Sequence, residues 1–209
     1  MGHFLVSRLA AGAAGTQTLN GGSGKTSLMS PGKKDAGKLS KAELVKLAVK
    51  KVKEHEPGFD PSRFSRVRAF QRGNERRVEF SNPVEFVPRD TCAYYSASVY
   101  LGELESVSCD EASNPDGFEC DEPRFYQPSA DDEKAAAEVL RTMELPPARD
   151  IGPDETITIY DRESHYEVIQ RTKYGVAHFK LDKKSKHFEE TMHKDLAQHD
   201  EGSFTEMEK

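Results

Sequence analysis

Apolar residues are scarce in this chain, and tryptophan is absent. Only 35% of the 209 residues are apolar, or about 42% with the 15 Gly, whereas globular domains contain roughly 45–50% when glycine is counted. The 11 Phe and 7 Tyr are enough for modest cores, so we expect folded parts beside segments that do not pack. The length suits one larger domain or two small ones, because a domain has about 100–200 residues.

Long apolar runs are also missing. No stretch of the sequence approaches the roughly 18 consecutive apolar residues that a membrane-spanning helix needs. We therefore expect a soluble protein without a membrane span.

Cysteine is sparse, and no C-x-x-C pair exists to support a zinc site. Cys109 and Cys120 flank a turn-rich loop, and in an exported protein a disulfide between them would add roughly 2–3 kcal/mol of stability. Cys92 would then be a buried strand thiol or one end of a different pair. In the cytosol all three would be free thiols. We favour the Cys109–Cys120 disulfide, and with it an exported protein over a cytoplasmic one.

The net charge of −6 is unevenly distributed. Residues 1–53 contain ten Lys and Arg against two acids, and residues 103–133 contain eleven acids against one Arg. Residues 1–38 have few large side chains, so we expect a disordered arm or a degenerate targeting segment. The glycine-rich segment 20–26 lacks the opening glycine and the flanking strand of a phosphate-binding loop. We expect no cofactor there.

A helix followed by strands is predicted for a first unit, residues 39–109. Ser40 and Glu43 have the spacing of a capping box. Apolar residues then recur at helical spacing until Pro57-Gly58 ends the helix. The strands expected after it are 66–70, 77–81, a short edge piece at 84–87, the alternating run 92–101, and 104–109 pairing back on that run.

An acidic loop or linker is predicted at 110–128, and a second unit at 129–196. Ser129 and Asp132 repeat the helix cap, and Pro146-Pro147 ends the helix. The acids of the loop do not have the spacing of a calcium-binding loop, so we expect no metal site. The elements expected after this helix are strands at 156–160, 165–170 and 176–181, a turn into 186–192, and a frayed tail at 197–209.

The order of cap, helix, proline stop and strands thus occurs twice. One helix packed on antiparallel strands is a standard two-layer arrangement. The predicted fold class is α+β, with two helix-plus-antiparallel-hairpin units behind a disordered arm.

A family resemblance follows from the second unit. The run Tyr166-Glu167-Val168, followed by Phe-Lys-Leu-Asp-Lys-Lys-Ser at 179–185, resembles the small PepSY and cystatin-like bacterial proteins, and the layout is similar to NTF2-fold immunity proteins. The resemblance covers about residues 40–109 and 129–196, and Lys186 stands where the PepSY turn usually ends in glycine. It implies binding or inhibition and offers no catalytic residues.

A candidate binding surface is formed by aromatic and basic strand residues. Alternation places Arg66 and Arg68 on one strand face, and the strand at 92–101 supplies Tyr94, Tyr95 and Tyr100. Basic residues interleaved with aromatics suit nucleic acid, but the acidic net charge argues against that partner. We expect a protein or peptide partner.

The sequence contains no recognisable catalytic set. We therefore expect a non-enzymatic binding or inhibitory module that engages a protein or peptide. One alternative is an intracellular toxin-immunity protein that presents its acidic region 103–133 to a basic toxin. Another is a small NTF2-like enzyme, for which His178 and Asp161 are the candidate acid–base residues, if either lies in an apolar cavity.

Overall fold

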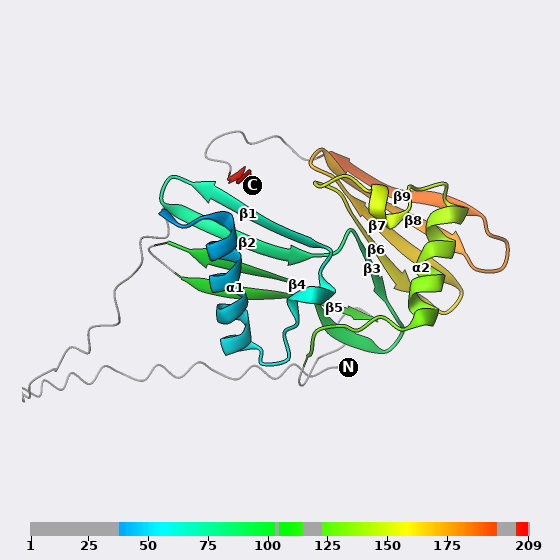
Figure 1. The fold of residues 1–209 in the computed structure, drawn as a ribbon. Coiled ribbons are helices and arrows are strands. Elements are labelled where there is room, and N and C mark those ends of the chain that lie inside the picture. The colour runs from blue at the N-terminus through cyan, green and yellow to red at the C-terminus, as the bar shows by residue number, and fades with distance from the viewer. Residues whose placement is uncertain (1–37, 103–104, 115–122, 196–203, 209) are drawn as a thin grey trace, which may run out of the picture. The chain divides into compact units, whose positions relative to one another are not determined.

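The computed structural model describes residues 38–102, 105–114, 123–195 and 204–208 (Figure 1). The predicted arm, apart from its last residue, and the centre of the predicted acidic loop lie outside this part of the chain. The described residues contain two α-helices and two five-stranded sheets, which confirms the α+β class. In this part of the chain no helix has the length and apolar character that crossing a membrane requires.

Helix α1 (Lys41–His55) begins where the sequence predicts. Ser40 Oγ accepts a hydrogen bond from the Glu43 amide, and the Glu43 carboxylate accepts one from the Ser40 amide at 2.9 Å. These bonds satisfy amide groups that have no partner within the helix. The buried face of α1, with Leu44 and Val52, packs on the first sheet.

The first sheet has the order β10-β1-β2-β4-β5, and every neighbouring pair is antiparallel. Gly73, with a φ of 56°, supplies the turn between β1 and β2. Strand β5 continues beyond the expected boundary at Cys109, so part of the predicted acidic loop is strand. The strands of this sheet are β1 (Arg66–Arg72), β2 (Glu75–Ser81), β4 (Thr91–Leu101), β5 (Ser106–Asn114) and β10 (Thr205–Glu206).

Strand β10 corrects the expectation of a frayed tail. Glu206 lies opposite Phe70 of β1, and the Met207 amide donates to the Ala69 carbonyl at 2.8 Å. Glu206 also forms an ion pair with Arg68 at 2.7 Å. The end of the chain therefore covers the β1 edge through contacts that are remote in sequence and invisible to local patterns.

Helix α2 (Ala130–Thr142) begins at the predicted second cap, with reciprocal bonds between Ser129 and Asp132. It packs on the second sheet, whose order is β3-β6-β7-β8-β9. The hairpin at β6 and β7 is confirmed, as is the strand that follows it, β8; the segment after the predicted turn is the strand β9. The strands of this sheet are β3 (Val84–Val87), β6 (Thr156–Asp161), β7 (His165–Arg171), β8 (Gly175–Asp182) and β9 (Phe188–Asp195).

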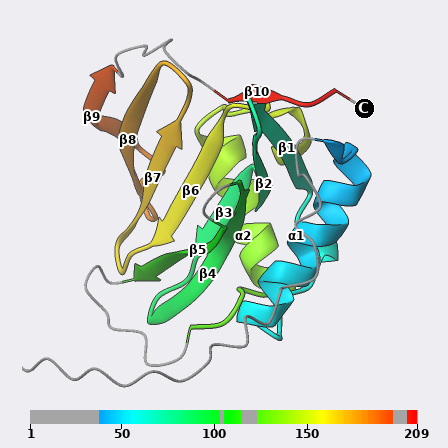
Figure 2. The same ribbon diagram turned by 90° about the vertical axis from the view of Figure 1, so that its left-hand side faces the viewer.

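Strand β3 departs from the expected division into units. It follows β2 in the sequence, yet it pairs with β6 in parallel, with Glu85 opposite Thr158, and forms the edge of the second sheet (Figure 2). Pro83 and Pro88 bound the strand and limit it to four residues. The chain then returns to the first sheet through Asp90, whose φ is 57°.

Asn114 fastens this crossing. It is 2% exposed, and its Nδ2 donates to the carbonyls of Val87, Pro88 and Asp161 at 3.0–3.2 Å. Arg162 donates to its Oδ1 at 2.6 Å. One side chain at the end of β5 thereby holds the end of β3 against the end of β6.

Replacing Asn114 with Ala leaves three carbonyl groups without this donor. We expect Asn114→Ala to lower the free energy of unfolding by about 2–3 kcal/mol, because buried polar groups that lose a partner are costly. Urea unfolding monitored by circular dichroism measures the change. Asn74→Ala, the same replacement at an exposed turn, is the control and should stay within about 0.5 kcal/mol. Equal effects of the two variants would contradict this role for Asn114.

Candidate functional site

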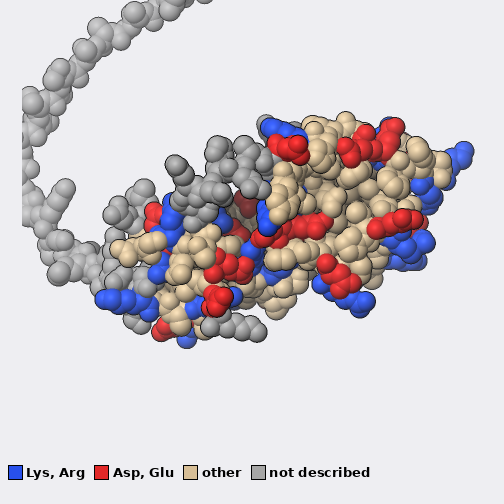
Figure 3. All heavy atoms as spheres, turned by 90° about the horizontal axis from the view of Figure 1, so that it is seen from above, with Lys and Arg blue, Asp and Glu red and all other residues tan. Residues whose placement is uncertain are grey.

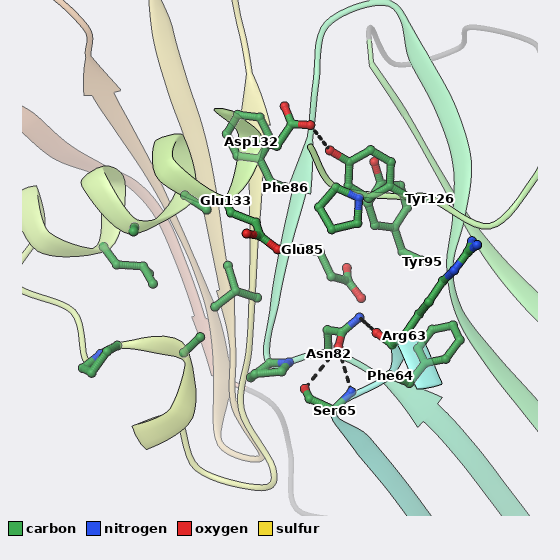
Figure 4. A pocket seen from close by; sticks show the side chains of 18 of the residues that line it. Arg63, Phe64, Ser65, Asn82, Glu85, Phe86, Tyr95, Tyr126, Asp132 and Glu133 are labelled. Atoms are coloured by element: carbon green, nitrogen blue, oxygen red, sulfur yellow. Dashed lines mark hydrogen bonds between the residues drawn. The ribbon is translucent and has the colours of Figure 1, made fainter. Parts of the chain in front are cut away.

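A pocket of about 600 Å³ lies beside the crossing strand β3 (Figure 4). Its walls come from β3, from α2 and the segment after it, from β4, and from the loops around residues 63–65 and 126–128. Most of the lining is apolar. The aromatic and aliphatic side chains of the lining include Phe64, Phe86, Tyr94, Tyr95, Tyr126, Ala136 and Leu140.

Glu85 is the central polar group of this pocket. Successive side chains on a strand point to opposite faces. Phe86 packs with the α2 core, whereas Val87 joins a small cluster that contains Tyr95 of the first sheet. Glu85 shares the face of Val87, and Figure 4 shows its carboxyl group within the pocket, near Tyr95. The exposed part of the Glu85 side chain therefore faces the pocket.

The surroundings of Glu85 disfavour its charge. Burial raises the pKa of the Glu85 carboxyl from 4.5 to about 7. The hydrogen bond from Thr158 Oγ1 at 3.2 Å and the charge of Arg171 lower this pKa, while Asp110 raises it. Among the described residues no Lys, Arg or His lies within ion-pair distance of this carboxyl group. This carboxyl group therefore titrates near neutral pH rather than near pH 4.5.

Two tyrosines lie at one end of the pocket. The rings of Tyr95 and Tyr126 are stacked, with centroids 4.9 Å apart. Tyr126 donates from its hydroxyl group to Asp132 Oδ2 at 2.7 Å. Tyr95 is 6% exposed, and its hydroxyl group has no hydrogen-bond partner among the described residues. Burial raises the pKa of both hydroxyl groups, so both are neutral donors at physiological pH.

The remaining polar groups of the lining are already engaged or exposed. Asn82 Oδ1 accepts from the amide and hydroxyl of Ser65 at 2.9 and 3.1 Å. Arg63 lies 3.7 Å from Asp60, and Arg141 of α2 is exposed. Among the described residues of the lining, Glu85 and Tyr95 are therefore two largely buried polar groups with capacity left for a ligand.

This arrangement has two chemical capacities. A carboxyl group beside an unpartnered hydroxyl group, in a mainly apolar cavity, can fix the polar end of a ligand whose body is apolar. A carboxyl group that titrates near neutral pH can also exchange a proton with a substrate.

The aromatic residues of the expected binding surface are dispersed. Tyr95 is buried between the sheets and lines the pocket, as does Tyr94, which packs against the first core. Tyr100 lies 36% exposed at a different place, beside Arg77 and Phe204. The three tyrosines do not form one surface.

Both arginines of the expected binding surface make contacts within the chain. Arg66 donates to the carbonyls of Ile151, Gly152 and Glu155 at 2.5–2.7 Å. Arg68 pairs with Asp154 and with Glu206. Alternation placed both correctly on the face opposite the core. Their partners are remote in sequence and were not predictable.

The cysteine expectation is corrected. Cys109 is a free thiol on β5, packed against the first core, and burial raises its pKa to about 11. The predicted Cys109–Cys120 disulfide is therefore not formed, and Cys109 lies within the paired strand β5 rather than at the base of a loop. Cys120 lies outside the described residues. Cys92 lies on β4, partly buried.

The two acid–base candidates lie elsewhere. Asp161 pairs with Lys183, and His178 faces Glu167 at 3.9 Å. Neither lines the pocket. In the part of the chain that the structure describes, no group of three side chains suits a metal ion.

Comparison with known proteins gives no relative. No family model, curated protein or solved structure matches this chain. The resemblance to PepSY, cystatin-like and NTF2-fold proteins therefore stays a prediction.

Glu85 was not singled out from the sequence, although the sequence contains a feature that indicates it. It is the single charged residue in the run Val84-Glu85-Phe86-Val87, between Asn82-Pro83 and Pro88. An acid inside a short apolar strand is unusual, because Glu is rarely buried without a partner.

The unpartnered hydroxyl group of Tyr95 gives a stability prediction. We expect Tyr95→Phe to raise the free energy of unfolding by about 1 kcal/mol, because it removes a buried donor that lacks an acceptor. Tyr126→Phe is the matched control. It removes a bonded hydroxyl group and should cost about 1–2 kcal/mol. Thermal and urea unfolding measure both changes, and a similar loss in both variants would show that Tyr95 is satisfied in solution.

Proposed function

We propose that the protein is a non-enzymatic binding module that holds a small ligand with an apolar body in the pocket beside β3. The observation that carries this proposal is the pairing of an apolar cavity of about 600 Å³ with two available polar groups. Ligand pockets in proteins measure about 300–1,000 Å³ and use a few polar groups to orient what they bind.

This proposal narrows the expectation drawn from the sequence. A binding module was expected there, engaging a protein or peptide through its strands. The pocket favours a small molecule, since Tyr95 faces inward and both arginines of the expected surface are engaged by the chain itself.

The distribution of surface charge supports the toxin-immunity alternative less well than it supports the binding module. Acidic and basic side chains are intermixed over the described residues of the face in Figure 3, and much of the acidic region 103–133 lies outside the described residues.

A second candidate function is acid–base catalysis on a small apolar substrate. The pKa of about 7 at Glu85 favours it, because a general acid or base works best when its pKa is near the working pH. Glu85→Gln would abolish such an activity. Saturable binding without turnover of any bound compound would support the binding module instead.

The proposed function is tested by binding of cyclohexylmethanol, a neutral probe, followed by amide chemical shifts. We expect shifts at β3, α2 and residues 126–128, with a Kd on the order of 1 mM for so small a ligand. Ala137→Trp should weaken binding at least ten-fold, because Ala137 lines the pocket and is itself exposed, so a large side chain there narrows the cavity without entering the core.

Lys134→Trp is the control for this experiment. Lys134 is exposed on the same helix and is not part of the lining, so its replacement should leave the Kd within two-fold. Absence of saturable shifts, or equal binding by the two tryptophan variants, would refute the proposed function.

A further inference from the structure

The polar groups of the pocket also indicate what kind of ligand it takes, and this inference rests on the proposed function. Glu85 is a carboxyl group with no cation beside it among the described residues. Such a group costs free energy when it is ionised in apolar surroundings, and a charge of opposite sign relieves that cost. The pocket thus offers a carboxylate that a cationic ligand could neutralise.

The neighbours of Glu85 suit an ammonium group. An ammonium group has three donors and no acceptor, and the Glu85 carboxylate and the Tyr95 hydroxyl oxygen can both accept from it. Figure 4 shows both groups at the same part of the pocket. Aromatic faces also attract cations, and the rings of Tyr95 and Tyr126 line this end.

We propose that the pocket binds a small alkyl amine, whose ammonium group pairs with Glu85 and whose apolar body lies against α2 and the aromatic lining. The apolar part has Phe86, Ala136 and Leu140 to pack on.

The charges of the lining favour this ligand over an anion. Three carboxyl groups line the pocket: Glu85, Asp132, which accepts hydrogen bonds from Tyr126 and Ser129, and Glu133, which is exposed. Of the two arginines in the lining, Arg63 is beside Asp60, and Arg141 is exposed. An anionic ligand would have to enter beside an acid that ionises near pH 7.

Binding of the amine depends on pH through Glu85. The charged and titratable groups that face it are Asp110 from β5, Arg171 from β7, Tyr95 from β4, and Asp132 and Glu133 from α2. Below pH 7 the proton on Glu85 competes with the amine, and above pH 7 the carboxylate is already free. The amine itself stays protonated, since alkyl ammonium groups ionise near pH 10. Affinity should therefore rise about ten-fold between pH 6 and pH 8 and then level off.

The test compares three probes with one apolar body: cyclohexylmethylamine, cyclohexylmethanol and cyclohexanecarboxylate. Each is titrated into the full chain at pH 6 and pH 8, by amide chemical shifts and by calorimetry. At pH 8 we expect the amine to bind at least ten-fold more tightly than the alcohol, and the carboxylate to bind most weakly. Only the amine should gain about ten-fold from pH 6 to pH 8.

Variants link the preference to Glu85. In Glu85→Gln the amine should lose its advantage over the alcohol, and its affinity should no longer depend on pH in this range. Glu138→Gln makes the same change on α2 outside the lining, and it should keep both the preference and the pH dependence. The wild-type pH series tests the inference even if Glu85→Gln does not fold.

The outcomes separate this inference from the proposed function. If the alcohol binds and Ala137→Trp blocks it, while the amine binds no better or the carboxylate binds best, the amine inference is overturned and the pocket keeps its proposed function. If none of the three probes binds, the proposed function fails, and the amine inference fails with it.

Discussion

The parallel pairing of β3 with β6 is the constraint on which this structure depends. Four residues between two prolines leave the first sheet, pair with the second, and return. Asn114 holds the crossing through three carbonyl groups from both sides of it. The pocket exists because β3 runs between the α2 core and Tyr95 of the first sheet, with side chains pointing to each.

This placement also explains the chemistry of the pocket. A strand in such a position is expected to be apolar on both faces, yet it contains Glu85. Among the residues that the structure describes, this carboxyl group has one hydrogen-bond partner, the Thr158 hydroxyl group, and the nearby Tyr95 hydroxyl group has none. Two polar groups kept at a cost in stability, at one end of an apolar cavity, are typical of functional sites rather than of a packed core. In the proposed function, the same pair that lowers the stability of the empty protein would contact the ligand.

Local signals in the sequence account for most of the elements and for little of the site. The caps at Ser40 and Ser129 and the alternation of the strands predict both helices and the hairpins, because these depend on neighbouring residues. The parallel partner of β3 and the docking of Thr205–Glu206 on β1 depend on residues far away in the chain. Lys186, which stands where the PepSY turn usually ends in glycine, adopts a φ of 60°. The apolar run Val84–Val87 marks Glu85 as an unusual residue, but its place near Tyr95 follows from the crossing, which no local pattern shows.

The most direct test of this account is the ionisation of Glu85 itself. A pH titration of the ¹³C-labelled side-chain carboxyl groups, with the Glu85 signal assigned by its absence in Glu85→Gln, gives the midpoint for this one group. The account predicts a midpoint near pH 7, because the carboxyl group lies in an apolar pocket and no cation of the described residues is within ion-pair distance of it. A midpoint near 4.5, the ordinary value for this side chain, would show that Glu85 is fully solvated or already paired, and would contradict the account.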